Sequence, residues 1–205
     1  MKTIDFAKSA LIEVDVQNDF CPGGALAVAD GNAVAAPLNK LAHRFNAAGA
    51  PVIATQDWHP AGHCSFASTG RKPLEGEILW PDHCVQGTAG ADFYPDLDIK
   101  PVTLILRKGF RPAVDSYSAF FENDRRTATG LAGFLKGLGV EAVYLGGLAT
   151  DYCVFFSAMD AAKLGFTVYL LEDAVRGVNY PEGSVEKALD TMQRAGIRRT
   201  LSTAL

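Results

Sequence analysis

The chain lacks several features that define other classes of protein. Its 205 residues contain no basic cluster, no internal repeat, no low-complexity segment and no apolar run near the roughly 20 residues that span a bilayer. With 19 basic and 23 acidic residues, the net charge is only -4. We therefore expect neither nucleic acid nor a membrane as a partner. The first residues include an acid and lack a long apolar segment, so we expect no secretion signal.

Cysteine is also scarce, and no two cysteines form a CxxC pair. In a chain of this length without a secretion signal, that pattern favours reduced thiols in the cytoplasm over a disulfide framework. It gives little support to a structural zinc site. The four cysteines are Cys21, Cys64, Cys84 and Cys153.

The residues that are present fit one α/β domain. The chain is 48% hydrophobic and 20% charged, enough apolar material for a sizeable core. Segments typical of strands alternate with segments typical of helices, which implies right-handed crossovers between parallel strands. We predict a single domain over residues 1–205: a three-layer α/β/α fold with a mostly parallel central sheet of about six strands. The expected strands are 10–16, 51–56, 102–107, one starting at 143, 167–171 and a short one at 199–203; the expected helices are about 33–48, 131–136, one following 150 or 151, and about 181–195.

Reactive side chains stand at or just beyond the carboxyl ends of four different predicted strands. They are Asp15, Asp57, Lys108 and Cys153. In an open parallel sheet, ligands bind in the crevice beyond those strand ends. The sequence therefore predicts one site assembled from distant segments.

Cys153 is the candidate nucleophile of that site. The chain turns at Gly146 and Gly147 and then enters a helix, with Thr150 or Asp151 as the expected N-cap. A helix N-terminus and a nearby cation both favour a thiolate, so a lowered pKa is expected for Cys153. The alternative is a small buried hydrophobe.

Asp15 and Lys108 complete a chemically sensible set with this thiol. A carboxylate can accept the thiol proton and later protonate a leaving amine, and an ammonium can stabilise the anions. The alternatives are a turn-capping acid for Asp15 and a solvated strand-end lysine for Lys108. A second acid, Glu13, interrupts the same apolar strand, and we expect it at a partly exposed position.

A second group of residues has the chemistry of a metal site. Asp57 and His59 are two apart in an extended segment, which places them on one face, and His83 follows in a long irregular region. A carboxylate with imidazoles suits Zn²⁺ or Fe²⁺ better than Mg²⁺. His63 is either a further ligand or a residue that orients another ligand. A structural zinc held with Cys64 and Cys84 is an alternative that no paired spacing supports.

The segment 137–142 fits the GxGxxA form of the dinucleotide fingerprint. That motif must follow a strand and open a helix, whereas this segment precedes a strand. We interpret it as the end of a helix.

Seven segments of the chain resemble nicotinamidases, which belong to the isochorismatase-like cysteine hydrolases. The resemblance runs from about residue 10 to residue 183 and is carried by Asp15-Val-Gln-Asn-Asp-Phe20, Gln56-Asp-Trp-His-Pro60, the segment 63–67, Trp80-Pro-Asp-His-Cys-Val85, Lys108-Gly109, Asp115-Ser-Tyr-Ser-Ala-Phe-Phe121 and Gly147-Leu-Ala-Thr-Asp-Tyr-Cys153. It implies hydrolysis of nicotinamide to nicotinate and ammonia in NAD salvage, with pyrazinamide as a second substrate. The partner it implies is the small-molecule substrate nicotinamide, and the sequence leaves a homo-oligomer open.

The resemblance also assigns roles to residues. It implies a catalytic triad of Asp15, Lys108 and Cys153, and a divalent metal (Zn or Fe, with Mn as a further option) held by Asp57, His59 and His83. It further implies a cis peptide before Ala149, an oxyanion hole formed by the N–H groups of Ala149 and Cys153, and a substrate ring flanked by Phe20, Trp80 and Tyr117. Glu13 departs from the aliphatic residue that is usual in the first strand of the family.

Two competing functions stay open from the sequence. One is a related cysteine hydrolase that acts on another small amide or carbamoyl substrate. The other is a non-catalytic metal-binding α/β module. Ammonia release from nicotinamide, with and without a thiol alkylator, distinguishes these possibilities.

Overall fold

The computed structural model describes residues 4–205 and is built on one six-stranded, all-parallel sheet. The strand order is β3-β2-β1-β4-β5-β6, so β1 and β4 lie at the centre. The prediction of a parallel sheet of six strands is therefore confirmed. The strands are β1 (Ser9–Val14), β2 (Val52–Asp57), β3 (Leu104–Lys108), β4 (Ala142–Leu148), β5 (Thr167–Arg176) and β6 (Arg198–Thr200).

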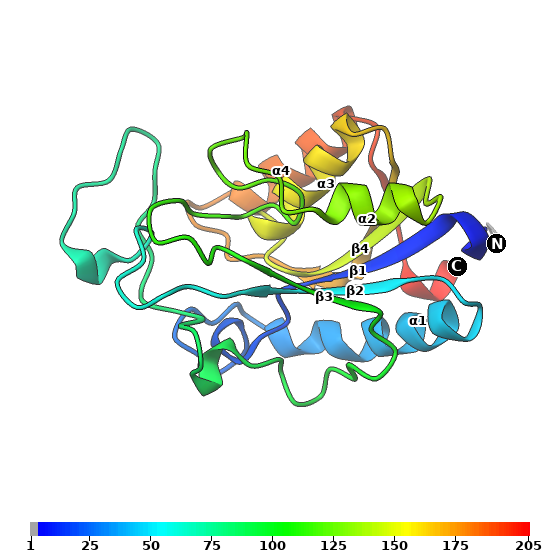
Figure 1. Cartoon of the computed structure of the whole chain (residues 1–205), viewed down its shortest axis with the longest axis horizontal. Helices are drawn as coiled ribbons and strands as arrows, with labels where there is room; N and C mark the ends of the chain where they lie inside the picture. Colours follow the sequence, from blue (N-terminus) through cyan, green and yellow to red (C-terminus); the bar gives the residue numbers. More distant parts are fainter. Residues whose placement is uncertain (1–3) are drawn as a thin grey trace.

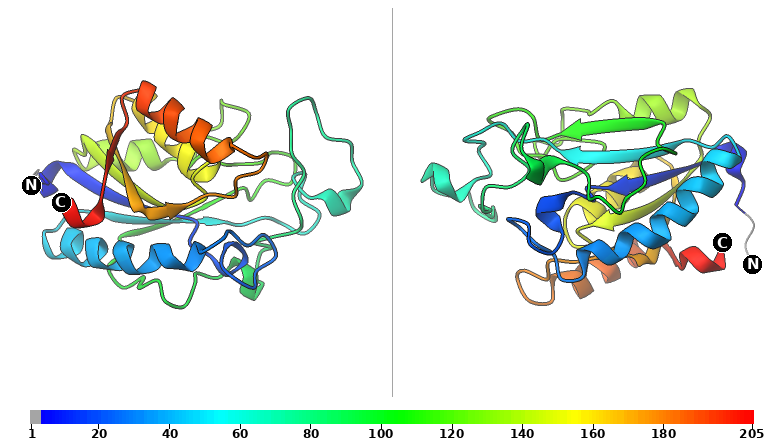
Figure 2. Two further views of the ribbon diagram at one scale, coloured as in Figure 1. Left: turned by 180° about the vertical axis from the view of Figure 1, so that it is seen from behind. Right: turned by 90° about the horizontal axis from the view of Figure 1, so that it is seen from below.

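Helices cover both faces of this sheet and give the three layers. Helix α1 (Ala35–Ala47) lies on one face, while α2 (Leu131–Gly137), α3 (Cys153–Lys163) and α4 (Ser184–Arg194) lie on the other (Figures 1 and 2). Helix α1 packs through apolar residues at helical spacing, because Leu38, Leu41 and Phe45 are buried on its sheet side. None of the helices in residues 4–205 is long and apolar enough to cross a membrane.

The first strand is buried over its whole length, and this corrects one expectation. Glu13 is fully buried, not partly exposed, because β1 has a neighbouring strand on each side and a helical layer on each face. Side chains alternate along a strand, so Glu13 lies on the same face as Leu11, which packs in the cluster that contains α1. Burial raises the pKa of the Glu13 carboxyl to about 8, with a smaller contribution from the negative charge of Asp98.

The remaining differences from the predicted elements concern where elements begin and end. Strand β5 extends to Arg176, well past the predicted end at 171, and α4 begins at Ser184, not at Pro181. The segment 137–142 does end a helix: Gly139 has φ +72°, and its N–H donates to the Lys136 carbonyl at 3.0 Å. The interpretation of this segment as a helix end is confirmed.

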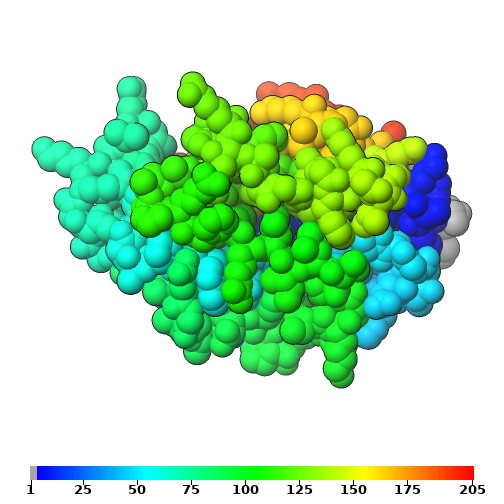
Figure 3. Space-filling view, in the orientation of Figure 1, coloured from blue at the N-terminus to red at the C-terminus, as the bar shows by residue number. Residues whose placement is uncertain are grey.

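The long connection between β2 and β3 has only two short 3₁₀ helices, Ala67–Thr69 and Ala89–Ala91, along residues that the structure describes throughout. In the space-filling view, its first part projects at the end of the molecule opposite the amino terminus (Figure 3). The carboxyl ends of the strands face this same end of the molecule (Figure 1). The connection is therefore placed so that it can line a site at the carboxyl ends of the strands.

Candidate active site

The four reactive residues predicted from the sequence meet at one edge of the sheet. Asp57 and Lys108 are the last residues of β2 and β3 and are paired in register. Asp15 follows β1 directly, in a left-handed conformation (φ +48°) that turns the chain out of the strand. Cys153 is the first residue of α3, beyond β4. The predicted convergence of distant segments is what the structure shows.

The ammonium group of Lys108 is the centre of this cluster. Its Nζ lies 2.8 Å from Asp15 Oδ2, 2.5 Å from Asp57 Oδ1 and 3.5 Å from Cys153 Sγ. It also donates to the Ser116 carbonyl at 2.8 Å. Lys108 is fully buried, so these groups replace the water that its charge would otherwise need.

The carboxylate of Asp15 is oriented by a threonine on the neighbouring strand. Its Oδ1 accepts a hydrogen bond from Thr55 Oγ1 at 2.5 Å, and the Asp15 N–H donates to the same hydroxyl at 3.1 Å. The two contacts leave Oδ2 to face Lys108. An oxygen of Asp15 lies within 4.8 Å of Cys153 Sγ, so the acid and the thiol share this small space.

Burial and the neighbouring charges compete to set the protonation of the cluster. It raises the pKa of Asp15, because one ammonium cannot offset both the loss of water and the nearby charge of Asp57. Burial alone would also raise the pKa of Asp57, but Lys108 and His59 outweigh it, and the pKa of Asp57 is lowered. Burial lowers the pKa of Lys108, yet the two carboxylates outweigh it and raise that pKa well above its usual range. The ammonium therefore stays charged.

The pKa of Cys153 is the second corrected expectation. Burial raises the pKa of the thiol well above its ordinary value, Lys108 lowers it only in part, and Asp15 raises it further by charge and by a hydrogen bond. The sequence predicted a lowered pKa because it shows the helix end and the lysine but not the depth of the sulfur. The side chain of Cys153 is therefore a protonated thiol at neutral pH, and any attack by its sulfur would need a proton acceptor.

The loop that carries Cys153 presents two backbone donors. The Leu148–Ala149 peptide is cis, as the family resemblance implies. Neither the N–H of Ala149 nor that of Cys153 has a hydrogen-bond acceptor among the described residues, and both residues line the same pocket. The Ala149 carbonyl accepts from the N–H groups of Tyr152 and Val154 at 3.0 and 3.1 Å, which closes the turn into α3. The free N–H groups can therefore bind a substrate oxygen.

The expected N-cap of α3 is wrong. Tyr152 occupies the cap position, without a side-chain cap bond. The Asp151 carboxylate instead accepts hydrogen bonds from the N–H groups of Val178 and Asn179 and from Ser184 Oγ, at 3.0, 2.8 and 2.6 Å. Asp151 thereby joins the loop between β4 and α3 to the segment that follows β5.

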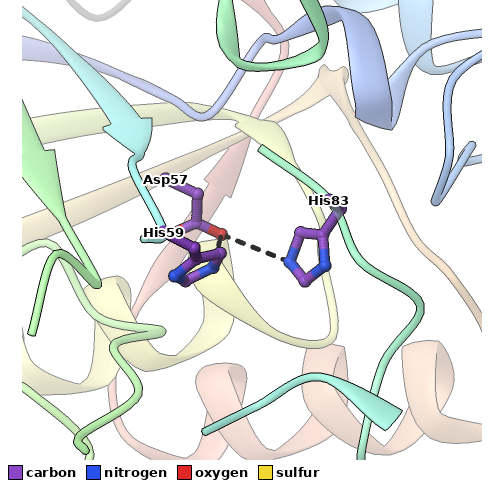
Figure 4. Close-up of side chains that lie close together, drawn as sticks. All are labelled: Asp57, His59 and His83. Carbon is purple, nitrogen blue, oxygen red and sulfur yellow. Dashed lines mark ion pairs between the residues drawn. The ribbon is translucent and has the colours of Figure 1, made fainter. Parts of the chain in front are cut away.

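The proposed metal ligands also lie together. The Nε2 atoms of His59 and His83 are 3.6 and 4.0 Å from Asp57 Oδ2, and the two imidazoles approach the carboxylate from different segments (Figure 4). Each ring is held through its other nitrogen, since His59 Nδ1 bonds the Gly109 carbonyl at 2.8 Å and His83 Nδ1 bonds the Pro81 carbonyl at 2.7 Å. Carbonyl partners fix the tautomer that leaves Nε2 free to ligate. These donors fit a divalent transition metal.

His63 differs from the other two histidines. Its ring stacks on His59 at 4.3 Å, but its Nδ1 contacts Ser65 Oγ at 2.7 Å and its Nε2 contacts the Val114 carbonyl at 3.2 Å. Both nitrogens thus have protein partners. None of the potential metal-binding groups found in residues 4–205 includes Cys64 or Cys84, which argues against the structural zinc alternative. All four cysteines are free thiols.

A pocket that is partly open to solvent joins the cluster and the proposed metal ligands. Phe20, Trp80 and Tyr117, the predicted substrate-binding residues, all line it, together with Cys153 and two of the predicted metal ligands, Asp57 and His83. Trp80 Nε1 donates to Tyr117 Oη at 3.0 Å, which holds these two rings as a unit. An apolar pocket with a few convergent polar groups is typical of a site for a small aromatic molecule.

Sequence reasoning missed several residues of this site. Leu26, Asp115, Tyr152 and Val178 also line the pocket, and the buried side chain of Gln17 contacts the backbone of Asp57. Asp115, Tyr152 and Gln17 belong to the segments that carried the family resemblance, so their positions were noted without a role. Leu26 and Val178 have no chemical signal in sequence, because an aliphatic wall residue looks like any core residue.

Comparisons with known proteins identify the family of this chain. The family described as "Isochorismatase domain" matches residues 9–204. A nicotinamidase of Acinetobacter baylyi is 46% identical over 94% of this chain and 92% of its own length. The solved structure of an Acinetobacter baumanii nicotinamidase and pyrazinamidase has a TM-score of 0.91 at 48% identity, covering 97% of this chain and 98% of that chain. A Pyrococcus horikoshii pyrazinamidase solved in complex with zinc has a TM-score of 0.82 at 42% identity, covering 95% of this chain and 99% of that chain. This chain belongs to the isochorismatase domain family.

Proposed function

We propose that the chain is a nicotinamidase, an amidohydrolase that converts nicotinamide to nicotinate and ammonia. The single observation that carries the proposal is the contact of Lys108 Nζ with both Asp15 Oδ2 (2.8 Å) and Cys153 Sγ (3.5 Å) at the base of an aromatic pocket. Relatives named nicotinamidase at 46–48% identity over nearly the whole chain support the same activity.

Asp15 starts the reaction as the proton acceptor. As Cys153 Sγ attacks the carboxamide carbon, the thiol proton passes to Asp15, so the buried site carries no free thiolate while it is at rest. The N–H groups of Ala149 and Cys153 stabilise the tetrahedral oxyanion. Removing one preorganised donor at such a site typically lowers the rate by about 10²–10³.

Collapse of the tetrahedral intermediate releases ammonia. Asp15 returns its proton to the leaving nitrogen, the C–N bond breaks, and a thioester to Cys153 remains. Water then attacks the thioester carbon while Asp15 accepts a water proton, and that proton passes to the departing sulfur. The products are the restored thiol and nicotinic acid, whose carboxyl group loses its proton to water to give nicotinate. The fixed ammonium of Lys108 stabilises whichever partner, carboxylate or sulfur, is negative at each stage.

Asp57, His59 and His83 are the residues that would hold the divalent metal, Zn or Fe, with Mn as a further option. When bound, it supplies a Lewis acid for the pyridine nitrogen and so a template for the ring. The donor set fits because Asp57 Oδ1 contacts Lys108 while Oδ2 faces the imidazoles. The two halves of the site thus share a single carboxylate.

Phe20, Trp80 and Tyr117 flank the substrate ring in this proposal, and the same pocket accepts pyrazinamide. A different small amide or carbamoyl substrate is the competing assignment within the family. The oligomeric state and a cytoplasmic location stay predictions of the sequence.

Ammonia release from nicotinamide by wild type and by Cys153→Ala tests this proposal. We expect turnover by wild type, its loss on thiol alkylation, and no turnover by Cys153→Ala in a protein that still binds nicotinamide. Retained amidase activity in Cys153→Ala would refute the mechanism. The wild-type protein could instead be inactive on nicotinamide but release ammonia from another carboxamide or carbamoyl compound. That result would change the assigned substrate and leave the proposed mechanism in place.

A further inference from the structure

The side chain of Gln17 makes three hydrogen bonds beside the proposed metal site, and none of the functional roles above uses it. Its Oε1 accepts from the Asp57 N–H at 2.8 Å, and its Nε2 donates to the Asp57 carbonyl at 2.8 Å. Nε2 also donates to the Ala91 carbonyl at 2.8 Å. The side chain is fully buried, so all three contacts are shielded from water.

These contacts occupy the position beside the end of β2 that a longer β1 would fill. Strands β1 and β2 are in register only as far as Glu13 and Ala54, and β1 ends at Val14 as the chain turns away through Asp15. Strand β2 continues to Asp57, whose other neighbour is Lys108 of β3. The backbone groups of Asp57 that face the vacated side would be buried without partners, at a cost of about 1–3 kcal/mol each. The Gln17 carboxamide presents an acceptor oxygen and a donor nitrogen to Asp57 in the spacing of a peptide group, and it occupies that place, while the second N–H of Nε2 serves Ala91.

Asp57 is the residue at which precise placement matters most. Its Oδ1 lies 2.5 Å from the Lys108 ammonium, while its Oδ2 faces His59 and His83. A shift of the Asp57 backbone would displace its carboxylate from the Lys108 ammonium and from the two imidazoles at the same time. The bond to Ala91 also ties Asp57 to the long connection that carries His83.

We propose that Gln17 is a positioning residue that replaces the missing strand beside Asp57 and thereby sets the affinity of the metal site. The proposal rests on the assignment of Asp57, His59 and His83 as the metal ligands. Gln17 does not line the substrate pocket, and its bonds to Asp57 are with the backbone and not with the carboxylate. Its effect therefore reaches the site through the backbone of Asp57.

Gln56 provides a matched control for this role. Its side chain is also buried, and its Nε2 donates to the same Ala91 carbonyl at 3.0 Å. Its Oε1 accepts from Arg107 Nε at 3.2 Å, and it makes no side-chain contact with Asp57 among the described hydrogen bonds. Gln56→Met thus removes two polar contacts, including one with the same Ala91 carbonyl, without releasing Asp57.

The experiment measures Zn²⁺ affinity of the metal-free protein by competition with a chromophoric chelator, alongside circular dichroism and thermal unfolding. Gln17→Met conserves size and removes all three bonds; Gln17→Glu keeps the acceptor for the Asp57 N–H and removes the donor. We expect both variants to bind Zn²⁺ more weakly, Gln17→Met by about 10–100-fold, the usual effect of losing a residue that orients a ligand. Gln56→Met is expected to bind Zn²⁺ as wild type does, even where its thermal midpoint falls. If Gln17→Met does not fold, Gln17→Glu alone decides.

Two results would overturn the proposal in different ways. Wild-type Zn²⁺ affinity in a folded Gln17 variant, or an equal loss in Gln56→Met, shows that the carboxamide has no specific effect on the ligand. If wild type does not bind Zn²⁺, or if Asp57→Ala binds it as wild type does, the assignment of the metal ligands is wrong. The proposal for Gln17 then fails because it rests on that assignment.

Discussion

Glu13 gives the sharpest test of how this core controls stability. It is fully buried in the central strand β1, and no described residue donates a hydrogen bond to either of its carboxyl oxygens. Burial raises its pKa from 4.5 to about 8. The folded protein therefore holds a proton on Glu13 at neutral pH that the unfolded chain releases.

The sign and size of the effect follow from this shift. A carboxyl group whose pKa is higher in the folded state takes up a proton when the chain folds. Its contribution to the free energy of unfolding is therefore unaffected by pH below about pH 4.5, and it falls as the pH rises toward the folded-state pKa. Using 1.36 kcal/mol per pH unit, ionisation of Glu13 lowers the free energy of unfolding by about 1.4 kcal/mol at pH 5.5 and about 4 kcal/mol at pH 7.5. Between these two pH values wild type should lose about 2.5 kcal/mol through this residue alone.

Urea unfolding of metal-free wild type, Glu13→Gln and Glu13→Leu at the two pH values measures this quantity. The glutamine variant keeps the size and polarity of the side chain but cannot ionise, so the difference from wild type isolates Glu13 from the histidines that titrate in the same range. We expect the gap in stability to shift in favour of Glu13→Gln by about 2.5 kcal/mol from pH 5.5 to pH 7.5. A gap that is the same at both pH values would show that Glu13 does not change protonation on folding, and the reasoning from burial would fail.

Two further substitutions test the contacts of the site. Lys108→Met leaves two buried carboxylates without their ammonium, so we expect a loss of about 3–5 kcal/mol at pH 7, smaller at pH 4; equal losses at both pH values in urea unfolding would contradict the ion-pair account. Gly109 has φ +64°, and a Cβ there would lie 2.4 Å from His59 Cε1. Gly109→Ala should therefore weaken Zn²⁺ binding by about tenfold or more, whereas Gly130→Ala, at φ +99° with open space around it, should lower stability alone. Equal Zn²⁺ affinity in the two alanine variants would show that His59 tolerates the displacement.

The sequence by itself determined the architecture and the meeting of the reactive groups. Apolar segments alternating with helical ones leave few solutions other than a parallel sheet with helices on both faces. Because parallel strands end at the same edge, Asp57 and Lys108 had to be neighbours wherever the strands were adjacent. The boundaries were less predictable: β5 runs five residues past its predicted end at 171, because pairing with β4 and not local propensity keeps it extended.

Only the tertiary structure decided the protonation of the site and the identity of its supporting residues. Sequence showed a helix end and a lysine near Cys153 and so predicted a lowered pKa, but the pKa is raised because the sulfur is buried by segments far away in the chain. Glu13 was expected to be partly exposed for the same reason: one strand does not reveal that both of its faces are covered. The role proposed for Gln17 follows from β1 ending before β2, which becomes visible only when the two strands lie side by side. Desolvation and missing partners depend on what distant segments enclose, and that is a property of the folded chain.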